Sequence, residues 1–223
     1  LILSSKLVQL KDYLRIIPPA NDGVKSYLAA IGFPSGKTNS GMTYCPIHHF
    51  NENISSHTES VFKVIDNNFP LTVRGNAIKY IISELSDNID QHSKYTHASL
   101  MAQFFKKKEF IDIGVVDNGV TIPKLFEKKG KNFKEDFEAI SMALSGTSTK
   151  KESGRGTGLI TTSRVVEAGL RGEYYIVSRN GAVGITPQDR KYFKLENYKF
   201  NGTMVYVRFK VPKREIDVYK YLN

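Results

Sequence analysis

Apolar residues recur at helical spacing in the segment 73–93, which is the clearest element of the chain. Its apolar stripe consists of Ile78, Ile82, Leu85 and Ile89. These positions follow i, i+4, i+7 and i+11, so they predict an amphipathic helix with one buried face. Glu84 and Asn88 stand four residues apart at the edge of that stripe. We therefore expect their side chains one helical turn apart on the same side of the helix.

The patterns that follow this helix predict the fold class. Strands are predicted over 98–105, 110–116, 174–178 and 203–211, and helices over 54–69, 133–144 and 157–168. A polar, lysine-rich segment over 121–153 surrounds one of these helices, and its length is typical of a mobile lid. The order of the elements predicts a two-layer α/β sandwich, in which helices cover one face of a mostly antiparallel sheet.

The first 57 residues carry a weaker pattern. Short helices are predicted over 8–17 and 23–31, and a loop over 34–40. We therefore expect an N-terminal extension of helices and loops over 1–57, of unknown role, followed by a domain over 58–223.

Two motifs of this extension suggest other chemistry and are not favoured. Gly32 to Thr38 resembles a phosphate-binding P-loop, but its first glycine is one residue too close to Gly-Lys-Thr, and the residues after it do not open a helix. Zinc would need a regular set of ligands, and the candidates have irregular spacing with a single cysteine. They are Cys45, His48, His49 and His57. We expect a loop in the first case and packing or surface roles in the second.

The formal net charge of +10 indicates an anionic partner, which can be nucleotide phosphates, an acidic protein or nucleic acid. The lysines are spread in small groups without a groove-reading motif, so we do not expect specific nucleic-acid binding. The single cysteine, Cys45, excludes an internal disulfide and fits a reducing compartment. No apolar run reaches the length of a membrane span. We expect a cytoplasmic protein without a membrane partner.

A run of alternating glycines stands directly before an apolar helical segment. It reads Gly154-Arg155-Gly156-Thr157-Gly158-Leu159. Glycines let a backbone approach phosphates closely, and the start of a helix offers free N–H groups to an anion. A dinucleotide-binding fingerprint would need glycine where Leu159 stands, so that interpretation is excluded. Asp117-Asn118-Gly119 ends an earlier strand, and Gly202-Thr203 precedes the last one.

In this order the motifs resemble those of the GHKL superfamily of ATPases, which includes type II topoisomerases, heat-shock chaperones of the ninety-kilodalton class, histidine kinases and mismatch-repair ATPases. The resemblance covers residues from about 58 to 211. It implies an α/β sandwich of the Bergerat type, with a lid over a bound nucleotide. The positions that match the family motifs are Glu84, Asn88, Asp117, Gly119, Gly154, Arg155, Gly156, Thr157, Gly158, Leu159 and Thr203.

The resemblance implies that ATP phosphates and Mg²⁺ bind near the first helix. Asn88 would ligate Mg²⁺, a cation that prefers oxygen donors, and Glu84 would orient or deprotonate the attacking group. The glycine run 154–159 would hold the phosphates. Histidine kinases usually carry a lysine where this chain has Gln91, so one phosphate contact differs.

On the base side, the resemblance implies that Asp117 accepts a hydrogen bond from the adenine amino group. Gly119 would let the ring lie against the backbone, and the Thr203 hydroxyl would help hold Asp117 and a water. Kinases of this type carry a second glycine where this chain has Thr121, which alters the loop beside the base but not the carboxylate.

Two function classes remain open. The first is an enzyme that transfers the phosphoryl group of ATP to water or to a partner protein, as anti-sigma-type kinases do. The second is a nucleotide-gated interaction module without turnover; the presence of Glu84 favours the enzyme. The motif around His57 lacks the proline and the second helix of a phospho-acceptor hairpin, which argues against a self-contained histidine kinase. We expect a protein partner, and a homodimer stays open.

Overall fold

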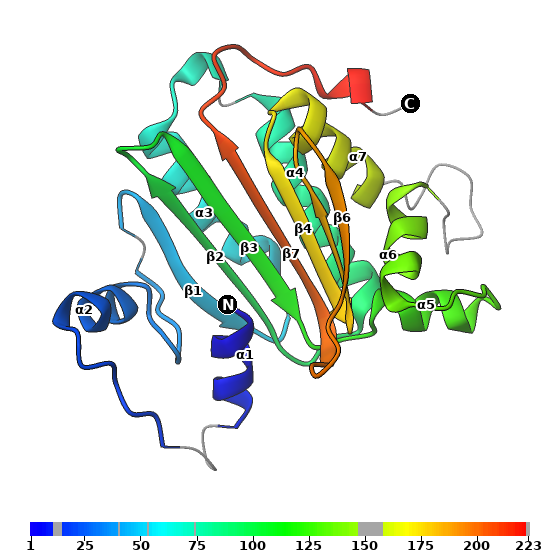
Figure 1. Cartoon of the computed structure of the whole chain (residues 1–223). Coiled ribbons are helices and arrows are strands. Elements are labelled where there is room, and N and C mark those ends of the chain that lie inside the picture. Colours follow the sequence, from blue (N-terminus) through cyan, green and yellow to red (C-terminus); the bar gives the residue numbers. More distant parts are fainter. Residues whose placement is uncertain (11–14, 40, 53, 74, 147–157, 222–223) are drawn as a thin grey trace.

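The computed structural model of the chain describes residues 1–10, 15–39, 41–52, 54–73, 75–146 and 158–221. Within these residues seven strands form one sheet in the order β1-β2-β3-β7-β4-β5-β6, and all neighbouring strands are antiparallel (Figure 1). The strands are β1 (Tyr44–Phe50), β2 (Ala98–Phe105), β3 (Phe110–Asp117), β4 (Glu173–Arg179), β5 (Gly181–Ile185), β6 (Arg190–Lys194) and β7 (Phe200–Lys210).

The centre of the sheet follows the alternation of the sequence. β2 and β3 form the predicted hairpin, and β3 pairs along its whole length with β7, where Ile113 stands opposite Val207. The alternating side chains Ile111, Ile113 and Val115 are all buried toward the helices. All four predicted strands are therefore confirmed.

Three strands were not predicted, because their sequences lack alternation. β1 contains a proline and two adjacent histidines, and its pairing with β2 shifts register between Cys45 and His48. β5 has five residues that are all buried, whereas all five residues of β6 are exposed. A short strand that is buried or exposed throughout shows no period of two.

A layer of helices covers one face of the sheet, as expected (Figure 1). It consists of α3 (Ile54–Asn68), α4 (Asn76–Asn88) and α7 (Gly158–Arg164). A short 3₁₀ turn, η1 (Leu71–Val73), precedes α4. α4 continues as a turn of π-helix, η2 (Ile89–Ser93), and α7 likewise as η3 (Val165–Gly169). The α/β two-layer sandwich with an antiparallel sheet is confirmed.

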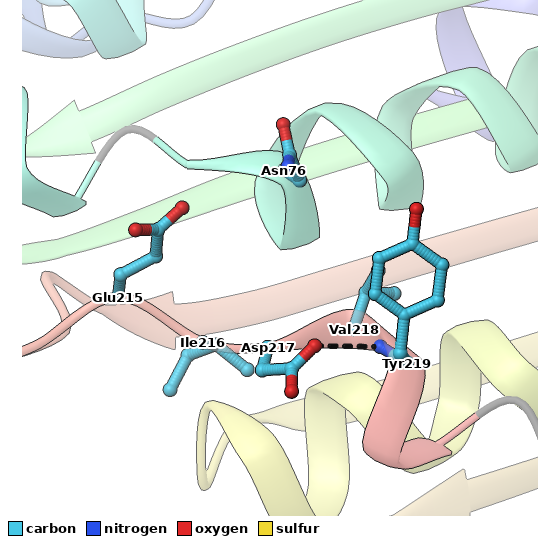
Figure 2. A pocket seen from close by; sticks show the side chains of 6 residues that line it. All are labelled: Asn76, Glu215, Ile216, Asp217, Val218 and Tyr219. Atoms are coloured by element: carbon cyan, nitrogen blue, oxygen red, sulfur yellow. Dashed lines mark hydrogen bonds between the residues drawn. The ribbon is translucent and has the colours of Figure 1, made fainter.

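After β7 the chain passes over the start of α4 and ends in the 3₁₀ turn η4 (Val218–Tyr221). It encloses there a pocket of about 300 Å³ (Figure 2). The pocket is lined by Asn76, Glu215, Ile216, Asp217, Val218 and Tyr219. Asn76 is the first residue of α4, whereas Glu84 and Asn88 lie in its second half, so this pocket is separate from the predicted nucleotide site.

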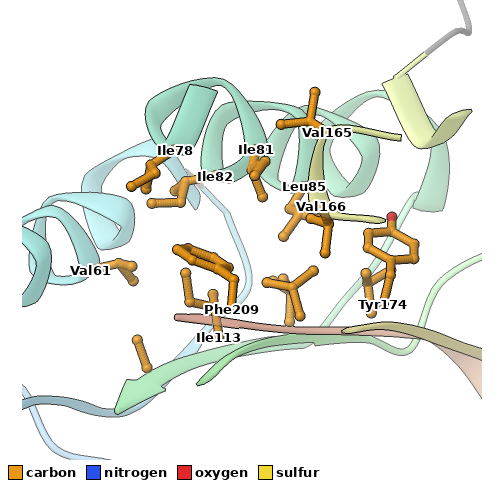
Figure 3. Packing of buried hydrophobic residues seen from close by; sticks show 14 of the residues in the cluster. Val61, Ile78, Ile81, Ile82, Leu85, Ile113, Val165, Val166, Tyr174 and Phe209 are labelled. Carbon is orange, nitrogen blue, oxygen red and sulfur yellow. The ribbon is translucent and has the colours of Figure 1, made fainter. Parts of the chain in front are cut away.

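The core lies between the helix layer and the sheet (Figure 3). Ile78, Ile82 and Leu85 of α4 face the sheet, where Ile113 and Phe209 meet them. Ile81 is also buried, so the apolar face of α4 is wider than the predicted stripe. A side chain of this size stabilises the fold by roughly 1.5–3 kcal/mol when fully buried. The core therefore holds α4, and with it Glu84 and Asn88, in a fixed position against the sheet.

Two helices, α5 (Ile122–Lys128) and α6 (Asp136–Leu144), lie within the predicted lid segment. Phe126 and Ile140 belong to the core, and Arg179 of β4 forms ion pairs with Glu127 and Asp136. Both helices are therefore packed against the rest of the domain, whereas residues 127–132 between them are exposed. The rest of the predicted lid, from residue 147 on, lies outside the described residues.

The N-terminal helices, α1 (Ile2–Gln9) and α2 (Asp22–Ala30), contact the face of the sheet that the helix layer leaves open. The Tyr27 hydroxyl donates to Oε1 of Gln103, 2.7 Å away. Gln103 points away from the helices, because its neighbours Ala102 and Phe104 are in the core and side chains alternate along a strand. The segment 1–57 is thus more than helix and loop, since β1 within it forms an edge of the sheet. Where the folding unit begins stays a prediction.

The unfavoured motifs of this segment take ordinary structural roles. Residues from Gly32 to Gly36 form a turn in which the Gly36 N–H donates to the Gly32 carbonyl at 2.6 Å, and the next element is β1 rather than the helix of a P-loop. Cys45 is buried in the core, and the His57 ring stacks on Phe50 with ring centres 4.7 Å apart. No cluster of three or more potential metal ligands was found among the described residues.

Candidate functional site

The second half of α4 carries Glu84 and Asn88, and both side chains face the start of α7. A Cβ atom added to Gly158 would overlap Oε2 of Glu84 and lie 3.5 Å from Nδ2 of Asn88. The two side chains therefore lie together above Gly158, as their spacing predicts. Glycine at this position leaves the space that the two polar groups occupy.

The Asn88 amide is suited to a cation. Its Nδ2 atom is buried and has no hydrogen-bond partner in the described part of the chain. Amide oxygen and nitrogen are assigned from their partners, so a rotated amide would place the oxygen at this position. Mg²⁺ commonly takes one or two protein ligands and fills its remaining positions with phosphates and water. An amide oxygen at this position would be an oxygen donor of the kind that Mg²⁺ prefers.

Asp117 ends β3 in a buried position, with its side chain turned into the fold. It is 4% exposed, and its Oδ1 accepts a hydrogen bond of 2.7 Å from the Gly119 N–H. Burial raises the pKa of Asp117 to about 7, although hydrogen bonds from Gly119 and the Ser93 side chain favour the ionised form. A buried carboxylate without a cation is costly. Such a group is a candidate for ligand binding.

The turn after Asp117 is held by close backbone contacts. A Cβ atom on Gly119 would overlap the carbonyl of Ser93, and the Val120 N–H donates to that same carbonyl at 2.5 Å. Ser93 ends η2, the continuation of α4. The helix that carries Asn88 and the turn that carries Asp117 are therefore joined at Ser93, a residue outside the sequence motifs. The close approach of the Ser93 carbonyl therefore requires glycine at position 119, independently of any contact with a ligand.

Thr203 lies directly opposite Asp117 in the pairing of β3 with β7. Its hydroxyl contacts the Ser178 hydroxyl at 3.0 Å, and Ser178 also accepts from the Ile122 N–H at 3.0 Å. Gly202, at a φ of 151°, leaves space for the Asp117 carbonyl, which a Cβ would overlap. Thr203 is thus placed beside Asp117, and Ser178 joins it to the first residue of α5. Ser178 carried no sequence signal, because its partners Ile122 and Thr203 are far from it in the chain.

Two neighbouring residues, Asn118 and Thr121, shape the loop after β3 through hydrogen bonds within the protein. The Asn118 side chain accepts from the backbone N–H groups of Thr96 and His97, at 3.0 and 2.9 Å, and so ties the start of β2 to the end of β3. Thr121, which replaces a family glycine, caps α5 by accepting from the Lys124 N–H at 3.3 Å. The departure from the family pattern therefore starts a helix.

The glycine run is described in part. Gly158 is buried at the first position of α7, and Leu159 packs against the core. Gly154, Arg155, Gly156 and Thr157 lie outside the described residues. The structure therefore brings together Glu84, Asn88 and Gly158 at one end of the site, and Asp117, Gly119 and Thr203 at the other.

A comparison with protein-family models agrees with this arrangement. The model described as histidine kinase-, DNA gyrase B-, and HSP90-like ATPase matches residues 74–213, more than half of the chain. The match includes every residue of the candidate site. No curated protein matches the chain. Among the described residues, no helix has both the length and the apolar character needed to cross a membrane.

Proposed function

The chain belongs to the family of histidine kinase-, DNA gyrase B-, and HSP90-like ATPases, and we propose that its ATP-binding domain transfers the γ-phosphoryl group of Mg²⁺-bound ATP to water or to a partner protein. The observation that carries this proposal is the placement of Glu84 beside Asn88, with both side chains above Gly158 at the start of α7. This arrangement supports the proposal, in which the base, the metal ligand and the end of the phosphate-binding segment act in one place.

In this proposal the base end of the site selects adenine. The Asp117 carboxylate accepts a hydrogen bond from the exocyclic amino group, which guanine lacks at the same position. Burial of Asp117 supports this role, because a carboxylate held out of water gains more from a hydrogen-bond donor than an exposed one does. Thr203, opposite Asp117 in the sheet, supplies a hydroxyl beside it.

At the phosphate end, Asn88 holds the metal and Glu84 acts on the attacking group. When bound, Mg²⁺ neutralises charge on the phosphate oxygens. The Glu84 carboxylate accepts a proton from water or from a partner's side chain and so acts as general base. Gly158 leaves room for this carboxylate. The glycine run from Gly154 to Gly158 would hold the phosphates, as its resemblance to the family motif implies.

The acceptor in a transfer reaction is proposed to be a residue of a partner protein. His57, the chain's own candidate, is not favoured because its sequence lacks the proline of a phospho-acceptor hairpin. A cytoplasmic location and a homodimer remain predictions.

The test follows label from γ-labelled ATP with Mg²⁺ into free phosphate or into protein, with and without candidate partners. Glu84→Gln is expected to lower the rate by roughly 10²–10⁴, the usual contribution of a general base, at unchanged affinity for ATP. Asp87→Asn is the matched control, because Asp87 is an exposed residue of the same helix. Wild-type protein that binds ATP but neither hydrolyses it nor labels a partner would instead support a nucleotide-gated interaction module.

A further inference from the structure

A row of three polar side chains crosses three neighbouring strands at the base end of the site. Thr203 of β7 stands opposite Asp117 of β3 on one side and opposite Ser178 of β4 on the other. Directly opposed residues of antiparallel strands project to the same face of the sheet and lie close together. Asp117 and Ser178 are 4% and 0% exposed, and Thr203 between them is half-buried. The row therefore connects the interior of the fold with the carboxylate that the proposed function assigns to adenine.

The Ser178 hydroxyl is the hydrogen-bonding centre of this row. Its oxygen accepts from the Ile122 N–H at 3.0 Å, and its proton has two acceptors within reach, the Gly202 carbonyl at 3.1 Å and the Thr203 hydroxyl at 3.0 Å. A hydroxyl has a single proton to donate. If Ser178 donates to Gly202, then Thr203 donates to Ser178 and offers only an acceptor to the site. If Ser178 donates to Thr203, the Thr203 proton is left for the site.

The second arrangement matches the chemistry of adenine. The adenine amino group, a donor, stands beside the ring nitrogen N1, an acceptor. A site with Asp117 as acceptor and Thr203 as donor offers the complementary pair. Guanine carries a carbonyl acceptor beside an N–H donor at N1, so neither group would find its partner, and a site built to form such hydrogen bonds rejects a ligand that lacks them. The direction of the Thr203 hydroxyl therefore contributes to the choice of base.

We propose that Ser178 is a positioning residue that turns the Thr203 hydroxyl into a donor toward the bound base, and that it links this arrangement to the start of α5. This inference rests on the proposed function, because it takes Asp117 as the adenine-binding carboxylate. The link is the Ile122 N–H, a fixed donor at the first residue of α5. Ser178 accepts from this donor and donates to Thr203, and hydrogen bonds that run in one direction strengthen one another.

The experiment measures affinity by titration calorimetry for ADP and for 1-deaza-ADP, in which a C–H group replaces the acceptor N1. Ser178→Ala is expected to weaken ADP binding roughly fivefold, because Thr203 loses the donor that fixes its hydroxyl, and to change 1-deaza-ADP binding by less than about twofold. The increase in ADP affinity on adding Mg²⁺ should stay that of the wild type, since the proposed metal site lies at the other end of the nucleotide.

Two comparisons separate positioning from a general loss of stability. In a Thr203→Val background, Ser178→Ala should still lower the melting temperature, because the Ile122 N–H loses its acceptor, but it should not weaken ADP binding further. Ser86→Ala is the matched control. Ser86 is a buried serine whose hydroxyl donates to the Ile82 carbonyl of its own helix, so this variant should bind ADP like the wild type.

Hydrogen exchange tests the link to α5 without changing Ser178. Saturating ADP is expected to slow exchange of the Ile122 amide in the wild type and to slow it clearly less in Thr203→Val, because valine interrupts the hydroxyl chain between the base and Ser178. Equal slowing in both proteins would overturn the link to α5. Equal weakening of ADP binding by Ser178→Ala in the two Thr203 backgrounds would overturn the positioning role, and either result leaves the proposed function intact. Wild-type protein that binds GDP as tightly as ADP would overturn both the adenine assignment and this inference.

Discussion

At the scale of single residues, the candidate site holds polar groups that do not stabilise the ligand-free fold. Asp117 is a buried carboxylate with a raised pKa, and the Nδ2 atom of Asn88 is buried without a partner among the described residues. An unsatisfied buried polar group costs about 1–3 kcal/mol. Such costs are typical of positions kept for ligand binding, where the ligand supplies the missing partner.

The titration of Asp117 leads to a prediction about stability. Burial raises its pKa from 3.8 to about 7, so its contribution to the free energy of unfolding is fully present below pH 3.8 and is lost as the pH rises through about 7. Asp117→Asn stays neutral at every pH and keeps an oxygen for the Gly119 N–H. Thermal melting of the nucleotide-free proteins should therefore show the variant gaining stability relative to the wild type between pH 4 and 7, and levelling off above.

The same titration should appear in nucleotide binding. Ionised Asp117 can accept a hydrogen bond from the adenine amino group at either oxygen, whereas protonated Asp117 carries a proton on one of them. Wild-type affinity for ADP should therefore weaken as the pH falls below about 7. Asp117→Asn should bind more weakly at pH 8, by about 1–3 kcal/mol, and should lack this pH dependence. Titration calorimetry at pH 6 and 8 measures both effects. Titration of the ADP phosphates affects both proteins equally, so it cancels in the comparison. If the affinity for ADP changed with pH in the same way in both proteins, the adenine assignment would be contradicted.

Asn88 gives a prediction about the metal. Asn88→Ala removes an amide whose Nδ2 has no described partner, so the fold should keep its melting temperature within a few degrees. The increase in ATP affinity on adding Mg²⁺ should be lost, whereas affinity measured in excess chelator should stay close to that of the wild type. A variant that still responds to Mg²⁺ would place the ligand elsewhere.

At the scale of elements, the contact between α4 and α7 decides whether the polar side chains face a common point. Gly158→Ala would place a methyl group against the end of the Glu84 side chain. That side chain is flexible and alanine favours a helix by about 1 kcal/mol over glycine, so the variant should fold with nearly unchanged stability. Displacement of Glu84 should nevertheless lower ATP turnover, roughly 10²-fold or more.

Gly114→Ala is the matched control for this variant. Gly114 lies in β3 on the opposite face of the sheet, and an added Cβ would contact only the end of the Leu1 side chain, at 3.2 Å. Turnover should be close to that of the wild type. If Gly158→Ala kept full activity as well, the close approach of Gly158 to Glu84 would have no functional role.

At the scale of the whole molecule, the sheet extends beyond the segment that matches the family. β1 pairs with β2 and belongs to the predicted extension, and its residues Cys45 and Ile47 are at most 1% exposed. Chain 58–223 lacks this strand and the first turn of α3. It should melt at a clearly lower temperature than chain 41–223, which keeps both. Equal melting temperatures would show that the folding unit begins near residue 58.

The sequence by itself determined the elements whose pattern is periodic and the motifs whose chemistry is local. The apolar stripe of α4 and the alternation of β7 predicted both elements, because each buries one face. The spacing of Glu84 and Asn88 likewise predicted that they lie together, since four residues make one helical turn.

The tertiary structure decided what depends on contacts between distant segments. The hydrogen bonds of the Ser93 carbonyl and of the Ser178 hydroxyl join residues far apart in the chain, so no local pattern indicates them. The edge strands β1 and β6 also escaped prediction, because pairing with a neighbouring strand rather than their own composition makes them strands. Local periodicity therefore predicts elements, whereas packing decides which polar groups meet.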